Sequence, residues 1–442
     1  MDVHPGATIP PVHEEEAKPG EMAVGVVIGR TSEFFDFFVY AIASVLVFPQ
    51  LVFPFVSPLT GTLYSFAIFA LAFVVRPLGT VIFLRLERLY GAKDFIAEEP
   101  AESVDNLIAH KQKYWSLTQI YQQASEADVV IVDGDGDIVF STPPRRQTLF
   151  LLAMIELGLR LKKPVVLVNS MISDCATSGR NLKTMATMRA LLERCEGAFL
   201  RDAESYEYVR KEMPAVKAQL IPDSLFAWLP RFASPNSHPP ADGDFILPYP
   251  ESEEYWGKLD FSKPYICIGG GALAGSNPDR AAQTYGKLVD AILQLGLQVC
   301  LTENDTPDSF LRRIAKDKGI GLVPVNTPIV AAAAVLAHAR LFISGRYHPS
   351  IMASLGGTPC IFLGSHAHKM ESLARLLEYG DRGQFGGFPS DQEIAAIVSL
   401  AEDYLAQGES LRERIRRVAQ FHCAEVSKLP ARLKQALVGA HA

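Results

Sequence analysis

The residue types best suited to chemistry in this 442-residue chain lie in the segment Ser344–Ser350, which contains Arg346 and His348. A guanidinium group can bind a carboxylate or a phosphate through two parallel hydrogen bonds. An imidazole can transfer a proton near neutral pH. The segment follows an apolar strand pattern and begins a helical one, and a helix N-terminus favours an anion. We therefore predict that Arg346 binds substrate and that His348 is catalytic.

A second candidate segment is Asp133-Gly-Asp-Gly-Asp137, which also follows an apolar strand pattern. Its glycines permit close backbone approach to a ligand, and a carboxylate can accept a proton from a hydroxyl group. We predict that Asp135 or Asp137 is a catalytic base. A calcium loop is a weaker interpretation, because the glutamate and the flanking helices of that motif are missing. A plain strand-to-helix turn is the alternative.

Three consecutive glycines follow another apolar run and are predicted to form a substrate-binding turn: Gly269, Gly270 and Gly271. Backbone N–H groups in a turn that leads into a helix can hold a phosphate. The segment does not match the G-x-G-x-x-G pattern of dinucleotide sites, so a phosphate contact, a sugar-nucleotide contact and a simple turn all remain open.

Lys369 follows the next apolar run and supplies another cation at the same predicted sheet edge, where we expect it to bind substrate. The nearby His366 and His368 are spaced for a possible metal site, but no third ligand is evident. We therefore predict no metal site, and the proposed chemistry requires no cofactor.

Composition limits the class of protein. The chain has 42 Lys+Arg against 49 Asp+Glu, a net charge of −7, which argues against a nucleic-acid partner. Its six cysteines form no C-x-x-C pair, so a zinc knuckle or a disulfide framework is not expected. A reducing compartment suits them best.

The elements that position these residues are short apolar strands alternating with amphipathic helices. The pattern predicts two Rossmann-like α/β domains with parallel sheets, at 95–240 and 241–442, the second with C-terminal helices. A proline-rich segment, 229–250, joins them. The predicted strands are Asp128–Val132, Pro164–Val168, Gly197–Leu200, Ala218–Ile221, Tyr265–Ile268, Leu297–Leu301, Leu341–Ser344 and Pro359–Leu363.

Residues 1–94 are predicted to be an acidic tail and a transmembrane hairpin, followed by a polar linker over 92–105. Residues 37–75 contain no Asp, Glu, Lys, Arg or His, and prolines break the apolar run into spans at Val24–Phe48 and Leu59–Leu84. Basic residues flank the hairpin, which places its ends, and the catalytic part, on the cytoplasmic side of the inner membrane.

Three charged residues lie in or beside these spans: Glu33, Asp36 and Arg76. They are functional intramembrane groups, or, as we favour, Glu33 and Asp36 lie at the interface and Arg76 pairs with one of them. The segments 29–40 and 76–79 resemble the first two helices of metabolite:proton symporters of the major facilitator superfamily, over residues 22–93. Two helices cannot form a transport pathway between bundles, so we expect an anchor or an oligomerisation element.

The block Ser344–Pro359, followed by Lys369, is similar to polysaccharide pyruvyl transferases over roughly residues 120–385. The Arg-Asp-x-x-Ser segment at Arg201 and the later Asp223 also resemble that family. The resemblance implies a fold like GT-B glycosyltransferases and the use of phosphoenolpyruvate to build a pyruvate ketal on a sugar. It further implies that Arg346 and His348 hold or protonate the donor, that Lys369 assists and that Arg201 binds substrate.

We therefore expect a transferase whose partners are phosphoenolpyruvate, the saccharide hydroxyl groups of a polysaccharide or its lipid-linked precursor, and the inner membrane. Two alternatives stay open: a sugar-nucleotide glycosyltransferase of the same architecture, and an inactive membrane-tethered binding protein.

Overall fold

The computed structural model describes residues 95–232, 238–240, 254–365, 367–380 and 383–438, and six positions between 56 and 64. The chain divides into two units, Met1–Gly91 and Ala92–Ala442, and the account below concerns the second. Apart from four positions of the second span, both predicted membrane spans lie outside the described residues, as do Glu33, Asp36 and Arg76. In the described part of the chain, no helix is both long and apolar enough to cross a bilayer.

The first half of the second unit is built on a four-stranded parallel sheet with the order β1-β3-β5-β6. Runs rich in valine and leucine form its central strands and are buried on both faces, which is typical of parallel sheets covered by helices. The strands are β1 (Val130–Asp133), β3 (Val165–Ser170), β5 (Gly197–Leu200) and β6 (Ala218–Leu220).

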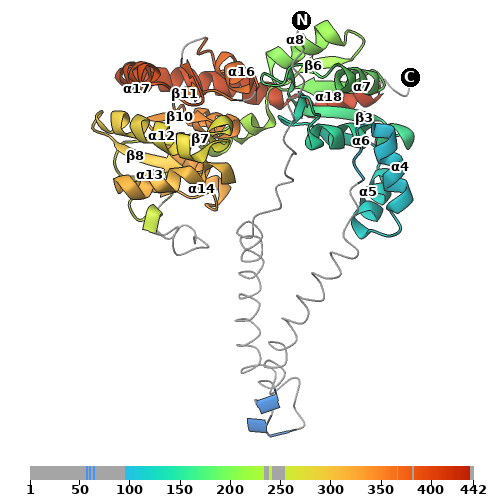
Figure 1. Cartoon of the computed structure of the whole chain (residues 1–442), viewed down its shortest axis with the longest axis horizontal. Coiled ribbons are helices and arrows are strands. Elements are labelled where there is room, and N and C mark those ends of the chain that lie inside the picture. Colours follow the sequence, from blue (N-terminus) through green and yellow to red (C-terminus); the bar gives the residue numbers. More distant parts are fainter. Residues whose placement is uncertain are drawn as a thin grey trace, which may run out of the picture. The chain divides into compact units, whose positions relative to one another are not determined.

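Helices and a small second sheet surround this sheet (Figure 1). The helices are α4 (Pro100–His110), α5 (Trp115–Glu126), α6 (Arg146–Arg160), α7 (Leu182–Leu192) and α8 (Ala203–Glu212), and the small parallel sheet pairs β2 (Ile138–Phe140) with β4 (Ile172–Asp174). The predicted linker over 92–105 is wrong from Pro100 onward. Val104 and Leu107 of α4 pack against Leu157 of α6, and this burial stabilises a helix there.

The second half is a six-stranded parallel sheet with the order β12-β11-β10-β7-β8-β9. Its strands are β7 (Tyr265–Gly271), β8 (Gln298–Thr302), β9 (Gly321–Val323), β10 (Leu341–Gly345), β11 (Cys360–Leu363) and β12 (Gln384–Phe385). Chain order reverses between β7 and β10, which are neighbours. In open α/β sheets, ligands bind outside the carboxyl ends of the strands at such a reversal.

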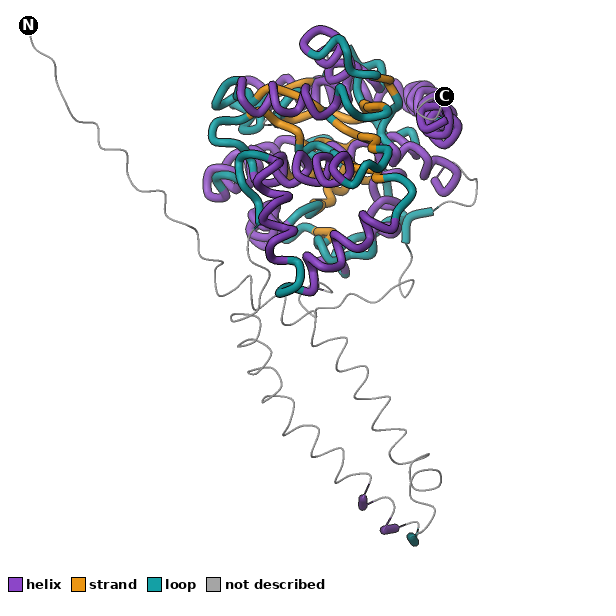
Figure 2. Tube along the Cα trace, turned by 90° about the vertical axis from the view of Figure 1, so that its right-hand side faces the viewer, coloured by secondary structure: helices purple, strands orange, loops and turns teal. Residues whose placement is uncertain are grey.

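Helices lie outside the strands in the tube view (Figure 2). The second half has its own set of helices. They are α11 (Ala272–Gly275), α12 (Pro278–Leu293), α13 (Phe310–Lys318), α14 (Ile329–His338), α15 (Tyr347–Leu355), α16 (Lys369–Leu376) and α17 (Asp391–Val426), with the short turns η1 (Ser224–Trp228), α9 (Leu229–Phe232) and η2 (Thr306–Ser309). α17 begins with a capping box formed by Ser390 and Glu393.

The C-terminal helix α18 (Leu429–Val438) returns to the first sheet. Arg432 donates a hydrogen bond to the carbonyl of Leu220 in β6, and Ala436 lies near Gly197 of β5. One continuous apolar core includes Phe199 of β5, Phe226 of η1 and strands β7, β8, β10 and β11. The predicted α/β class with parallel sheets is confirmed. The predicted domain boundaries remain a prediction.

Candidate functional site

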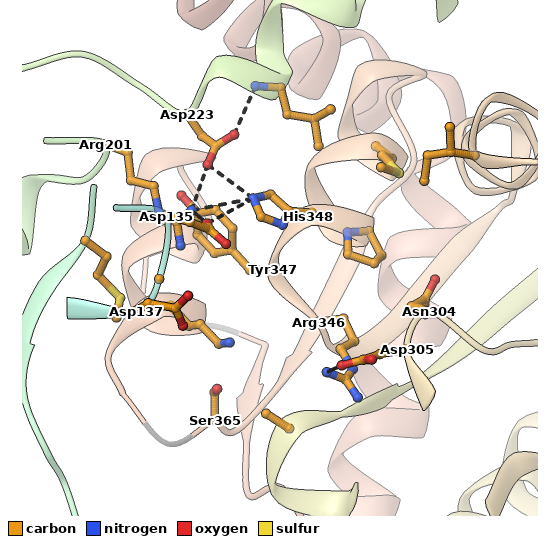
Figure 3. Close-up of a pocket in the computed structure, with 18 of the residues that line it drawn as sticks. Asp135, Asp137, Arg201, Asp223, Asn304, Asp305, Arg346, Tyr347, His348 and Ser365 are labelled. Atoms are coloured by element: carbon orange, nitrogen blue, oxygen red, sulfur yellow. Dashed lines mark hydrogen bonds and ion pairs between the residues drawn. The ribbon is translucent and has the colours of Figure 1, made fainter. Parts of the chain in front are cut away.

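A cavity of about 880 Å³ lies among residues that follow the carboxyl ends of strands in both sheets. The first half contributes segments after β1, β3, β5 and β6, and the second half contributes segments after β8, β9, β10 and β11. Figure 3 shows the charged residues that line it. Among the predicted site residues, those that line this cavity are Asp135, Asp137, Arg201, Arg346, His348 and Lys369.

A buried ion-pair network forms the wall contributed by the first half. Arg201, the residue after β5, is 1% exposed, and its Nη1 donates to Asp223 Oδ2 at 3.0 Å and to Asp135 Oδ1. Its guanidinium also lies over the ring of Tyr347, 4.2 Å from the centroid, where a cation is favoured. Arg201 therefore holds two carboxylates at the cavity wall.

The surroundings of Asp223 keep it ionised. Burial alone would raise the pKa of this carboxyl group, but the hydrogen bond from His348 and the charge of Arg201 outweigh burial and hold the pKa below its ordinary value. Asp223 also accepts a hydrogen bond from the backbone of Leu225 at 2.9 Å. Burial works against the charge of Arg201 too, yet Tyr347 and the carboxylates raise its pKa, so the guanidinium stays protonated.

His348 is the second residue of α15, and its ring reaches across the cavity to the first half (Figure 3). Nε2 lies 3.4 Å from Asp223 Oδ2, 3.5 Å from Asp135 Oδ1 and 3.5 Å from Arg201 Nη1. A protonated Nε2 can donate to either carboxylate, and a neutral one can accept from Arg201. Nδ1 has no partner among the described residues, and the side chain is 40% exposed, so Nδ1 is available to a ligand.

The segment Asp133–Asp137 joins β1 to β2, so the expected strand-to-helix turn is a turn between strands. Asp135 has a φ of +40°, and its carbonyl accepts from Met171 at 2.7 Å, which fixes the turn. Asp137 makes no ion pair with any described residue. Burial and the neighbouring Asp135 raise the pKa of Asp137. A raised pKa suits a carboxyl group that gains and loses a proton.

Arg346 lines the cavity, but carboxylates of this chain occupy all three of its guanidinium nitrogens. Nε and Nη2 bind the fully buried Asp308, at 3.1 Å and 2.7 Å, and Nη1 binds Asp305 at 2.8 Å. Both partners come from the segment after β8, next to β7 in the sheet. Arg346 is therefore held in place as a fixed charge, and its contact with a donor anion stays a prediction.

Gly269, Gly270 and Gly271 are the last residues of β7, not a turn, and are fully buried. A Cβ on Gly270 would lie 2.0 Å from Asp308 Oδ1, and one on Gly269 would lie 2.7 Å from Asn304 Nδ2. The cavity is lined by Ala272 rather than by these glycines. The structure thus gives Gly269 and Gly270 a packing role: they leave room for the side chains that follow β8.

We expect Gly270→Ala to destabilise the protein by about 1–3 kcal/mol, because the added methyl group displaces a buried carboxylate that pairs with Arg346. Chemical denaturation measures this change. Gly286→Ala in α12 is the matched control, since its Cβ has free space and alanine favours a helix. Equal midpoints for Gly270→Ala and the wild type would contradict the packing role.

Lys369 is the first residue of α16 and lines the cavity without a hydrogen bond or ion pair to any described residue. Burial, followed by the charges of Arg201 and Arg346, lowers its pKa. Neighbouring His368 has a structural contact: Nε2 lies 3.2 Å from Asp202 Oδ1 in the first half. His366 lies outside the described residues.

Within the described ranges, one group of side chains has the spacing of a metal site: Asp135, Asp223 and His348. Arg201 Nη1 binds both of these carboxylates and already places a positive charge among them. The geometry therefore favours proton transfer over metal binding at this point. Of the three aspartates in the Asp133–Asp137 segment, only Asp135 belongs to the group, which gives no support to a calcium loop.

Sequence reasoning missed several polar residues of the cavity: Arg145, Glu303, Asn304, Asp305 and Ser365. Four of them directly follow a strand, β8 or β11, so the rule that selected Arg346 and Lys369 would also have found them. Arg145 comes just before α6, and no strand-end pattern marks it.

Comparison with known proteins gives two separate results. The family model described as polysaccharide pyruvyl transferase matches residues 83–367. The N-terminal part is similar to the inner membrane metabolite transport protein YhjE of Escherichia coli, with 47% identity over 75 residues, and to the shikimate transporter of the same organism, with 48% identity over 61 residues. These segments are 16% and 14% of this chain, and they span only 17% and 14% of the transporters.

Among solved structures, the UDP-GlcNAc 2-epimerase of Methanocaldococcus jannaschii has 13% identity and a TM-score of 0.44, covering 73% of this chain and 82% of that one. The UDP-GlcNAc 2-epimerase of Neisseria meningitidis, bound to UDP-GlcNAc, also has 13% identity and a TM-score of 0.44. It covers 75% of this chain and 82% of that one.

Proposed function

We propose that this chain, which belongs to the polysaccharide pyruvyl transferase family, transfers the pyruvyl group of phosphoenolpyruvate to two hydroxyl groups of a saccharide and forms a ketal. One observation carries the proposal. The imidazole of His348 opens onto the cavity while two carboxylates and Arg201 face its Nε2. This arrangement can stabilise the imidazolium and leaves Nδ1 for the substrate.

In the proposed reaction His348 donates a proton to the methylene carbon of the donor. The adjacent carbon gains oxocarbenium character, and one sugar hydroxyl attacks it and loses its proton to a base. A second hydroxyl displaces phosphate and closes the ketal, and its proton leaves with the phosphate. The carboxylates and Arg201 that face Nε2 hold the ring in place, and fixed charges of this kind commonly account for several kcal/mol of transition-state stabilisation.

Asp137 is the better candidate for the base. Asp135 is already bound to Arg201, whereas Asp137 makes no ion pair with a described residue. Its raised pKa also suits proton acceptance from a hydroxyl group. Lys369 supports the binding of an anionic donor, whereas Arg346 is already paired with Asp305 and Asp308.

A second candidate function, transfer from a sugar nucleotide, is favoured by the apolar wall of the cavity. Trp228, Val325 and Ile329 line it and would suit an aromatic base. Thermal unfolding separates the two donors: phosphoenolpyruvate should raise the melting temperature and a sugar nucleotide should not. Stabilisation by a sugar nucleotide alone would support the second candidate.

We also propose that the N-terminal segment anchors the enzyme in the inner membrane with the α/β part in the cytoplasm. The 47% identity to part of a membrane transport protein supports this proposal. When cells that express the full chain are fractionated, the protein should be recovered in the membrane fraction. It should also stay there during carbonate extraction. Recovery in the supernatant would contradict it.

To test the function, the full chain is incubated with phosphoenolpyruvate and a panel of saccharides, and the release of phosphate is measured. Acceptor-dependent release is the expected result. Acceptor-dependent release from the wild type but not from His348→Asn would also exclude the inactive binding protein as an alternative.

A further inference from the structure

Three polar groups at one side of the cavity have no partner among the described residues. Within the described ranges, neither the guanidinium of Arg145 nor the ammonium of Lys369 makes a hydrogen bond or ion pair. The Oγ of Ser365 is buried and equally unpartnered. A buried polar group in a folded protein normally has a partner, so the buried Ser365 Oγ, beside two half-buried cations, indicates that a ligand binds at this wall.

Arg145 comes from the first half of the unit, immediately before α6. α6 has fifteen residues and no side-chain cap, so its first N–H groups are unsatisfied and its positive end lies at Arg145. The hydroxyl of Thr148 in the first turn of α6 donates to the carbonyl of Asp137 at 2.6 Å and ties the helix start to the cavity wall. Ser365 and Lys369 come from the second half, after β11.

The charge balance differs between the sides of the cavity. Asp223 pairs with Arg201, Asp305 with Arg346 and Glu303 with Arg312. Asp137 makes no ion pair with a described residue, but it lies within electrostatic range of Arg145 and Lys369. The charges of both residues lower its pKa, against the effect of burial. Figure 3 shows Ser365 and Asp137 on the same side of the site, away from Asp223. Two cations that have no ion-pair partner among the described residues therefore lie within electrostatic range of Asp137.

We infer that Arg145, Lys369 and Ser365 form the subsite for the phosphate group of the donor, an inference that rests on the function proposed above. A phosphate dianion would accept hydrogen bonds from a guanidinium, an ammonium and a hydroxyl group, and the end of α6 adds a favourable potential. Because the three residues come from both halves, the ligand bridges them. His348 then meets the methylene carbon, while phosphate stays at the opposite side.

Calorimetric titration of the full chain with inorganic phosphate and, separately, with pyruvate tests this inference. Arg145→Gln should weaken phosphate binding about 10- to 100-fold, since it removes a charge-assisted hydrogen bond. Ser365→Ala should weaken it about 2- to 10-fold, as expected for a neutral hydrogen bond. Pyruvate carries a carboxylate and no phosphate, so its affinity should change less than twofold in both variants.

Arg189→Gln is the matched control, because Arg189 is exposed on α7 and does not line the cavity. Circular dichroism confirms that each variant is folded. Unchanged phosphate affinity in Arg145→Gln, or an equal loss of phosphate and pyruvate affinity, would overturn the subsite. These binding measurements do not depend on turnover. If the wild type binds phosphate through Arg145 but never consumes phosphoenolpyruvate, the phosphate subsite is supported and the proposed function is refuted.

Discussion

Replacing His348 with asparagine is expected to lower kcat by about 10²- to 10⁴-fold, the usual contribution of a general acid. Asparagine keeps a polar group near Asp135 and Asp223 but cannot transfer a proton. The side chain is 40% exposed, so the fold should survive the change. Steady-state phosphate release with a saturating donor measures the loss, and KM for phosphoenolpyruvate should change much less than kcat.

His338→Asn is the control for this variant, because His338 lies in α14 and does not line the cavity. Its kcat should match that of the wild type. If His348→Asn retains wild-type kcat, His348 is not the proton donor. If its KM rises with an unchanged kcat, the ring only binds substrate.

Arg201→Met is expected to lower the free energy of unfolding by about 3–5 kcal/mol, because it leaves a buried carboxylate without its cation. Asp223 is 1% exposed, and Arg201 Nη1 is its ion-pair partner at 3.0 Å. Methionine fills a similar volume, so the expected loss comes from the unpaired charge rather than from an empty space. Denaturant unfolding measures it, with the exposed Arg189→Met as control.

The size of this loss should depend on pH. In the wild type the pKa of Asp223 lies below its ordinary value, so its ionised form stabilises the fold above about pH 4 and this contribution is lost as the pH falls. Without Arg201, only the His348 and backbone hydrogen bonds oppose burial, so the pKa of Asp223 is higher than in the wild type and its charged form stabilises the fold less. The difference between the two proteins should therefore be largest near pH 7 and smallest near pH 3. A difference that does not change with pH would contradict the ion-pair account.

Much of the fold follows from local patterns. The apolar runs at 164–168 and 341–344 have few alternatives to buried parallel strands, and both are observed, as are the other strands expected from the sequence. The strands that were missed are short: β2, β4 and β9 have three residues each and β12 has two. Segments of two or three residues are too short to show a hydrophobic periodicity, so tertiary contacts determine whether they form strands.

The sequence predicted residues of the candidate site that follow a predicted strand. Arg346, His348 and Lys369 follow β10 and β11, and parallel strands bring them to one edge. The partners of Arg346 could not be assigned from the sequence. Asp305 and Asp308 follow β8, about forty residues earlier, and only the order β10-β7-β8 places them beside it.

The network around Arg201 shows the same limit. Resemblance alone selected Arg201 and Asp223, and no local pattern indicates that Asp135 meets them. The meeting depends on the alignment of β1, β5 and β6 and on a turn in which Asp135 adopts a positive φ. The strand alignment and the turn conformation both depend on packing between distant parts of the chain, which a local sequence pattern does not reveal.

The central claim, protonation of an enolpyruvyl carbon followed by ketal formation, is tested most directly by the isotope content of the product. The full chain is incubated with phosphoenolpyruvate and an accepted saccharide in deuterium oxide, and the ketal methyl group is observed by NMR and mass spectrometry. One deuterium in each ketal methyl group, with one phosphate released for each ketal, is the predicted result. Transfer of a sugar from a nucleotide donor, with no deuterated ketal formed from phosphoenolpyruvate, would contradict the account.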